Sequence, residues 1–219
     1  MGGSQRRDAL VRAARATVGF LPEDEADALV RAGARAGASG LGPLVEVGAY
    51  RGRSTLFLAA ALAGCGVDPP PLLYSVDHHH GSEEMQAGWP DHDPSVVDPR
   101  TGAMDTLPFW RRAIEDARAG DLVAAVVGDS VRVAASWATP LSLCLLDGGH
   151  GAAIAWADYR GWSRHVAPGG LLVIHDVFPD PADGGRPPYE CFLDATSSET
   201  FTEEVASSCG SLRVLRRAR

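Results

Sequence analysis

The chain has 219 residues, of which 45% are hydrophobic, and a formal net charge of −8. This length and composition fit one globular domain with a buried core, and the acidic balance argues against a nucleic-acid partner, because phosphate contacts need a basic patch. No stretch is apolar enough for a signal region or a membrane span, so we expect no membrane partner. Four widely spaced cysteines without a CxxC pair indicate reduced thiols and a cytoplasmic protein.

Two helices are predicted in residues 1–40, ahead of a main domain at 41–219. Asp8–Thr17 is amphipathic, and Pro22–Ala36 begins with proline followed by three acidic residues, which suit the first turn of a helix. We expect these helices to cover the sheet, with one edge as a candidate place, or the active site. Whether they also pair two subunits into a homo-oligomer is left open.

From residue 41 onward, apolar strands alternate with helical stretches, a pattern typical of a parallel sheet covered on both faces. The predicted strands are Leu44–Val47, Leu72–Val76, Leu122–Val127, Leu141–Leu146 and Leu171–Ile174. The predicted helices are Thr55–Ala63, Leu107–Ala117, Val131–Trp137, Ala152–His165 and Tyr189–Ala195.

Two segments depart from this alternation. Phe201–Ala206 and Leu212–Leu215 flank a short turn, so we expect two closing strands antiparallel to each other. The long irregular insert His78–Asp105 is predicted to be a functional lid or a disordered loop.

A glycine-rich turn follows the first strand and opens a helix at Ser54. Gly48 and Gly52 are spaced GxxxG, and Tyr50 stands where a dinucleotide fingerprint would have its second glycine. Ligands of parallel α/β sheets lie at such strand ends. The turn therefore predicts a ligand site, with a dinucleotide disfavoured.

Polar residues close the predicted strands at what should be one edge of the sheet. Carboxylates at the ends of apolar strands must find partners, which favours a binding site over helix capping alone. The residues concerned are Glu46, Asp77, Asp129, Asp147, His175 and Asp176.

The motifs VEVGAYRGRST, LYSVD, GDS, LCLLDGGH and APGGLLVIHD resemble those of class I S-adenosylmethionine-dependent methyltransferases. The resemblance extends from about Leu41 to the C-terminus and is nearest to metal-dependent small-molecule O-methyltransferases of the catechol and macrolide-sugar type. It implies a Rossmann-like, seven-stranded, mostly parallel sheet with helices on both faces and an antiparallel C-terminal strand.

The resemblance also implies a site for S-adenosyl-L-methionine. The glycine turn would approach the methionine part, Asp77 would bind both ribose hydroxyls, and Asp129 with Ser130 would lie near the adenine. For Asp77, capping of the following segment is the alternative. The predicted cofactor-binding residues are Glu46, Gly48, Tyr50, Gly52, Ser54, Asp77, His78, Asp129, Ser130 and Asp147.

Similar positions carry metal ligands in these relatives, which implies a Mg²⁺ or Mn²⁺ site at Asp147, His175 and Asp176, with histidine replacing the more usual ligand at 175. A metal-free site in which these side chains bind substrate is the alternative. His150, three residues after Asp147, matches the position of a general base, and its alternative is a helix-start hydrogen-bond partner.

These features predict O-methylation of a small hydroxylated metabolite, with secondary metabolism suggested by the resemblance alone. Metal-independent N-methylation and non-catalytic cofactor binding are the alternatives, and a nicotinamide oxidoreductase is a more distant one. Three aromatic residues are predicted either to wall a substrate pocket or to pack in the core: Trp89, Phe109 and Trp110.

Overall fold

A seven-stranded sheet in the order β3-β2-β1-β4-β5-β7-β6 forms the centre of the molecule. The computed structural model describes residues 2–89 and 92–218 of the chain. Strands β1 to β5 pair in parallel, and β7 runs antiparallel to both of its neighbours, β5 and β6. The predicted fold class is confirmed. The strands are β1 (Leu44–Val47), β2 (Leu73–Asp77), β3 (Val123–Val127), β4 (Leu141–Leu146), β5 (Val166–Ile174), β6 (Phe201–Glu203) and β7 (Arg213–Arg217).

The two central strands are apolar except for Glu46 and Ser142, because helices cover both of their faces. Every residue of β1 and β4 is buried, as expected of strands inside a doubly covered parallel sheet. Their register pairs Val47 with Leu146, and the Asp147 N–H donates to the Val47 carbonyl at 2.9 Å. The first residues beyond these strands, Gly48 and Asp147, therefore lie side by side at the carboxyl edge.

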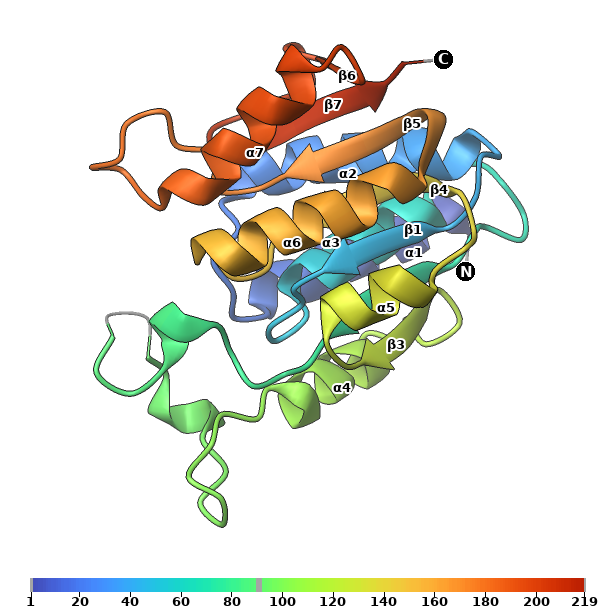
Figure 1. Ribbon diagram of the computed structural model, residues 1–219. Coiled ribbons are helices and arrows are strands. Elements are labelled where there is room, and N and C mark those ends of the chain that lie inside the picture. The colour runs from blue at the N-terminus through green and yellow to red at the C-terminus, as the bar shows by residue number, and fades with distance from the viewer. Residues whose placement is uncertain (1, 90–91, 219) are drawn as a thin grey trace.

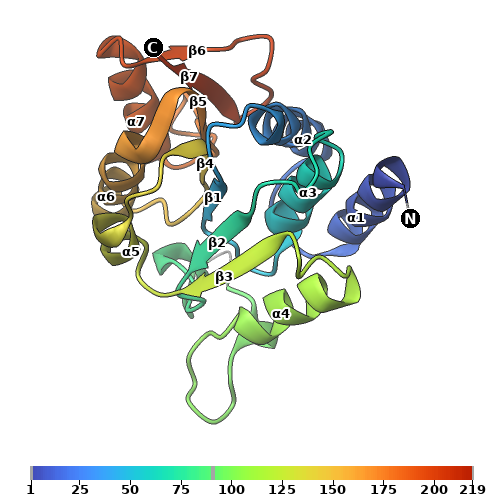
Figure 2. The ribbon, with the colours of Figure 1, turned by 90° about the vertical axis from the view of Figure 1, so that its right-hand side faces the viewer.

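Helices form a layer on each side of the sheet, as the edge-on view in Figure 2 shows. One layer contains α1 (Gly3–Ala16), α2 (Glu23–Ala38), α3 (Arg53–Ala63) and α4 (Leu107–Asp116). The other contains α5 (Ser130–Ser136), α6 (Ala152–Trp162) and α7 (Arg186–Ser197). None of the helices in the described ranges has the length and apolar character that a membrane crossing requires.

The N-terminal helices lie over a face of the sheet and not along its edge. Both α1 and α2 pack against α3 (Figure 2), with Leu10 and Leu29 buried beside Phe57 in one apolar cluster. Helix α1 starts at Gly3, earlier than the predicted Asp8. The loop between α1 and α2 reaches the carboxyl edge of the sheet, where it borders the cavity described below.

The insert after β2 extends away from the body of the molecule (Figure 1). Its described parts contain the 3-10 turns Glu83–Met85 and Pro94–Val96 and a bridge between Val97 and Met104. Asp93 fixes it to the glycine turn, because its Oδ2 accepts hydrogen bonds from the Tyr50 hydroxyl at 3.2 Å and from Arg51 at 3.1 Å.

Candidate functional site

The glycine turn between β1 and α3 needs glycine where the chain passes closest to β4. Gly48 has a φ of +86°, and a Cβ there would lie 2.2 Å from the carbonyl oxygen of Asp147. Gly52 also has a positive φ, of +97°, and closes the turn through its N–H to the Ala49 carbonyl at 2.8 Å. Tyr50 takes a left-handed conformation with a φ of 46° despite its side chain. Such strain in a non-glycine residue is typical of a functional turn.

Asp77, at the end of β2, holds this turn in place. Its Oδ2 accepts the N–H groups of Ala49 at 2.8 Å and Tyr50 at 3.0 Å, and its Oδ1 accepts the N–H of His79 at 2.7 Å. The carboxylate also borders the large cavity. Its predicted contact with ribose hydroxyls stays a prediction, but a role in shaping the turn is visible directly.

A cavity of about 280 Å³ lies along the carboxyl edge of the sheet, close to the size of small-ligand sites. An apolar part of its wall comes from Val18, Phe20 and Leu21. The ring centroids of Phe20 and Tyr50 lie 5.4 Å apart. Of the predicted site residues, the cavity is bordered by Gly48, Tyr50, Ser54, Asp77, His78, Asp129, Ser130, Asp147, His150 and Asp176.

Several expected residues lie outside this wall. Glu46 is fully buried beneath the turn, Gly52 faces Trp110, and His175 borders an adjacent smaller cavity. The aromatic wall expected from Trp89, Phe109 and Trp110 is absent from the described cavity lining, and Trp110 packs in the core instead. The packing alternative is therefore the right one for Trp110.

The far end of the cavity is formed where β3 meets α5. Asp129 caps α5 by accepting the N–H of Arg132 at 2.8 Å, and the Ser130 hydroxyl donates to Asp158. Burial raises the pKa of Asp158 to about 6, with a smaller contribution from the charge of Asp129. These groups provide hydrogen-bonding atoms at the end of the cavity where the adenine was predicted.

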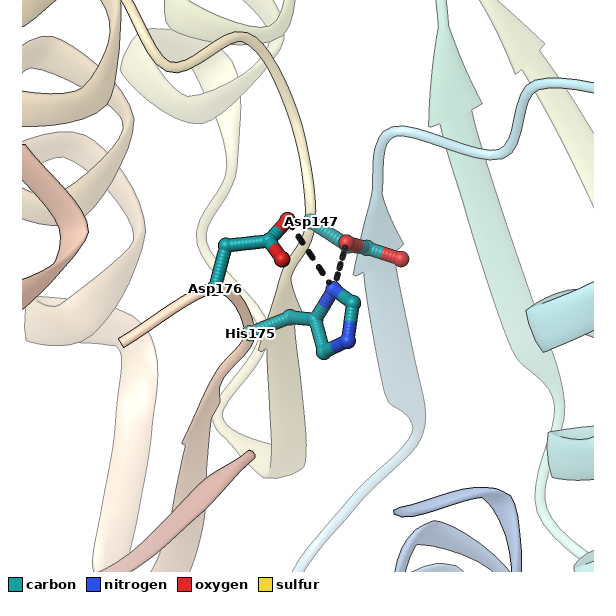
Figure 3. Close-up of side chains that lie close together, drawn as sticks. All are labelled: Asp147, His175 and Asp176. Atoms are coloured by element: carbon teal, nitrogen blue, oxygen red, sulfur yellow. Dashed lines mark hydrogen bonds and ion pairs between the residues drawn. The ribbon is translucent and has the colours of Figure 1, made fainter. Parts of the chain in front are cut away.

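Asp147, His175 and Asp176 meet at the ends of β4 and β5, as the sequence predicted (Figure 3). The Nδ1 atom of His175 lies 2.8 Å from Oδ1 of Asp147 and 3.1 Å from Oδ2 of Asp176. One ligand atom from each residue lies within 4.8 Å of the others. Asp176 has a left-handed φ of 56°, which marks this strand end as locally strained.

A third carboxylate, Glu25 from α2, approaches the other nitrogen of His175. Its Oε2 lies 2.7 Å from Nε2, and both side chains are almost fully buried. Burial alone would lower the pKa of His175, but the surrounding carboxylates, Asp147 above all, hold it well above its usual range. For Glu25 burial acts to raise the pKa, and hydrogen bonds from His175 and Ser211 outweigh it, so the pKa is lowered.

His150 lies on the cavity wall between Asp176 and Glu84, a residue of the insert. Its Nδ1 is 2.9 Å from Glu84 Oε1, which also accepts the backbone N–H of His150 at 3.2 Å. Its Nε2 is 2.8 Å from Asp176 Oδ2, yet this buried nitrogen makes no hydrogen bond of good geometry. Burial opposes the charged imidazole, but contacts with Asp176 and Glu84 outweigh it and raise the pKa of His150 to about 10.

The sequence did not reveal Glu25 or Glu84 as site residues. For Glu25 a signal existed, because it lies on the same buried stripe of α2 as Leu29, where a carboxylate needs a partner. Its place in the first turn instead suggested a helix-dipole role. Glu84 lies in an irregular segment and carries no periodic signal.

The donor set at the β4 and β5 ends fits a small divalent cation. Bonds of about 2.1 Å at right angles separate neighbouring ligand atoms by roughly 3.0 Å, close to the two distances measured from His175 Nδ1. Histidine ligands commonly donate their second N–H to a carboxylate, as Nε2 does to Glu25. Mg²⁺ prefers oxygen ligands, so a set of two carboxylates and one imidazole fits Mn²⁺ or Co²⁺ better than Mg²⁺.

Comparison with known proteins identifies the family. A family profile described as "Methyltransferase domain" matches residues 45–177, more than half of the chain. The fold is similar to that of the O-methyltransferase NovP, with a TM-score of 0.63 and 17% identity over 90% of this chain and 80% of that one. For calicheamicin methyltransferase CalS11 the TM-score is 0.63 and the identity 12%, over 97% of this chain and 91% of the other.

A third similar structure contains bound S-adenosylhomocysteine (SAH). It is the methyltransferase PaMTH1 of Podospora anserina, with a TM-score of 0.65 and 11% identity over 97% of this chain and 88% of that one. At such identities the likeness concerns the fold. With its family match, sheet order and carboxyl-edge cavity, the chain belongs to the class I S-adenosylmethionine-dependent methyltransferases.

Proposed function

We propose that this protein is a cation-assisted O-methyltransferase acting on a small hydroxylated metabolite. The observation that carries the proposal is the convergence of Asp147, His175 Nδ1 and Asp176 within 4.8 Å of one another. Asp147 and Asp176 also border the cavity, as does His150. Two of the three proposed cation ligands and a titratable imidazole thus face the same space.

Each residue has a distinct task in this proposal. Asp147, His175 and Asp176 would hold the cation, which when bound supplies positive charge that makes a nearby hydroxyl more acidic. S-adenosylmethionine supplies the electrophilic methyl group. His150 is oriented by Glu84 on Nδ1, which leaves Nε2 as the atom that would take the hydroxyl proton. His150 can take a proton only while its imidazole is neutral. Its contacts with Glu84 and Asp176 favour the charged imidazole instead, and a cation that offsets the charge of Asp176 would weaken this preference.

The oxygen acceptor is supported by the neighbouring structures that are named O-methyltransferases, NovP among them. The apolar wall of Val18, Phe20 and Leu21 would suit an acceptor that carries an apolar or aromatic part beside its hydroxyl. In this arrangement Phe20 and Tyr50 would border the acceptor side of the cavity.

A metal-independent N-methyltransferase is the second candidate, and one observation favours it. Both nitrogens of His175 already lie within 3.1 Å of carboxylate oxygens, so its side chain has partners without an ion. In that case Asp147 and Asp176, which border the cavity, would serve as a charged wall for an amine acceptor.

The deciding experiment measures S-adenosylhomocysteine production from matched hydroxyl and amine acceptors, with and without EDTA. The proposal predicts turnover with hydroxylated acceptors, loss of turnover in EDTA, and recovery with Mg²⁺, Mn²⁺ or Co²⁺. Asp147→Asn should behave like EDTA treatment, whereas Asp183→Asn, on an exposed loop, should match wild type. EDTA-insensitive transfer to amines would support the second candidate, and cofactor binding without any transfer would argue for a non-catalytic protein.

A further inference from the structure

Glu25 is a buried carboxylate that belongs to an N-terminal helix and not to the strand ends. It lies in the first turn of α2 and is 3% exposed. A carboxylate at this depth is costly unless its charge is paired and hydrogen-bonded. Its partners therefore indicate what the side chain does.

The loop before β7 holds the Glu25 carboxylate in one orientation. Its Oε1 accepts the Ser211 N–H at 2.5 Å, and its Oε2 accepts the Ser211 hydroxyl at 3.3 Å. Gly210 has a φ of +54°, and a Cβ there would lie 2.1 Å from Oε1, so the backbone itself closes around the carboxylate. Oε2 is thereby directed at His175 Nε2, 2.7 Å away.

We propose that Glu25 is a positioning residue of the cation site, selecting the His175 tautomer in which Nε2 carries hydrogen and Nδ1 is free to bind a metal ion. An ionised carboxylate can only accept a hydrogen bond, so the nitrogen facing it must be the donor. Nδ1 faces the carboxylates of Asp147 and Asp176, and a cation bound between them would offset their charges and take the lone pair that Nδ1 carries in the neutral ring. This inference rests on the proposed cation-assisted function and assigns a task to the N-terminal helix within it.

Glu25→Gln tests the assignment with a side chain of the same size. Both oxygens of Glu25 accept hydrogen bonds, whereas glutamine has one acceptor and one NH₂ group. If the NH₂ group faces His175, Nε2 becomes the acceptor and Nδ1 carries the hydrogen, which blocks ligation. We expect Co²⁺ and Mn²⁺ affinity, measured calorimetrically, to fall about 10- to 100-fold, the usual effect of losing such a partner.

A second background separates tautomer selection from a general effect on folding or charge. In His175→Asp the ligand has no tautomer, so adding Glu25→Gln should change cation affinity by less than about threefold. Glu23→Gln, on the same helix turn and paired instead with Arg15 and Arg53, is the matched control and should bind Co²⁺ like wild type. An equal loss from Glu25→Gln in both backgrounds, or no loss in either, would overturn the assignment.

A measurement on the unaltered protein removes any dependence on how the variants fold. Long-range ¹H–¹⁵N spectra of the Zn²⁺-loaded protein should show His175 with hydrogen on Nε2 and the metal on Nδ1; the opposite tautomer would refute the inference. Titration of wild type alone tests the proposed function separately. Wild type that binds no divalent ion rejects the cation site itself, whereas ion binding with the wrong tautomer rejects only the role of Glu25.

Discussion

Glu46 should make the stability of the protein fall with rising pH, and Glu46→Gln should remove that contribution. The side chain is fully buried in β1, where Oε2 accepts hydrogen bonds from Thr55 at 2.6 Å and Ser75 at 2.9 Å. Its other oxygen, Oε1, is buried without a partner. Burial, with a smaller effect from Asp147, raises its pKa from 4.5 to about 7.

The direction of the effect follows from proton binding. Between pH 4.5 and 7 folded Glu46 retains a proton that the unfolded chain has released, so its contribution is fully present below pH 4.5 and is lost as pH rises through 7. The whole difference corresponds to about 3 kcal/mol of unfolding free energy, of which about 2.5 kcal/mol falls between pH 5 and 8. The glutamine amide of the variant lacks some of the hydrogen-bond partners it needs, which lowers the unfolding free energy by the same amount at every pH. This cost therefore cancels when pH values are compared.

Urea unfolding of wild type and Glu46→Gln, followed by circular dichroism from pH 5 to 8, measures this difference. The unfolding free energy of wild type minus that of the variant should fall by about 2.5 kcal/mol between pH 5 and pH 8. The same substitution at Glu115, exposed on α4, is the control and should run parallel to wild type. Parallel curves for Glu46→Gln and wild type would refute the reasoning, because Glu46 would then ionise alike in both states.

Three further substitutions test the site. Asp77→Ala removes the acceptor of the turn N–H groups and should weaken S-adenosylhomocysteine binding at least about tenfold by calorimetry, and unchanged affinity would remove its cofactor role. His150→Ala should lower turnover about 10²- to 10⁴-fold while cofactor affinity stays near wild type, and unchanged turnover would exclude it as the base. Gly48→Ala should lower the melting temperature more than Gly66→Ala, because both have positive φ but only Gly48 meets the Asp147 carbonyl, and equal losses would contradict this.

The central sheet was predictable because its strands carry a purely local signal. Mostly apolar runs, interrupted only by Glu46 and Ser142, predicted β1 and β4 at their observed bounds. The predicted β5 began at Leu171, five residues late, because Pro168-Gly169-Gly170 reads as a turn. A register shift opposite Leu141 and Leu143 lets the sheet accommodate these residues within the strand.

The strand-end part of the site was predictable for a topological reason. Carboxyl ends of neighbouring parallel strands meet at one edge, so Asp147, His175 and Asp176 had to lie near one another once β4 and β5 were recognised. Glu25 and Glu84 reach the same edge from a helix and from an insert. Glu25 lies 150 residues before His175, a contact that depends on how α2 packs across the sheet and that no local pattern encodes.

The glycine turn and the proposed cation site are parts of one structural unit. Gly48 leaves no room for a side chain against the Asp147 carbonyl, and Asp147 borders both cavities. On the other side, the insert contacts the turn through Asp93 and the imidazole of His150 through Glu84. A change in the position of the insert would therefore shift the glycine turn and the proposed base together. Substitutions at the two anchors, Asp93 and Glu84, should therefore change cofactor affinity and turnover together. Substitutions confined to the part of the insert that extends away from the body should not have this joint effect.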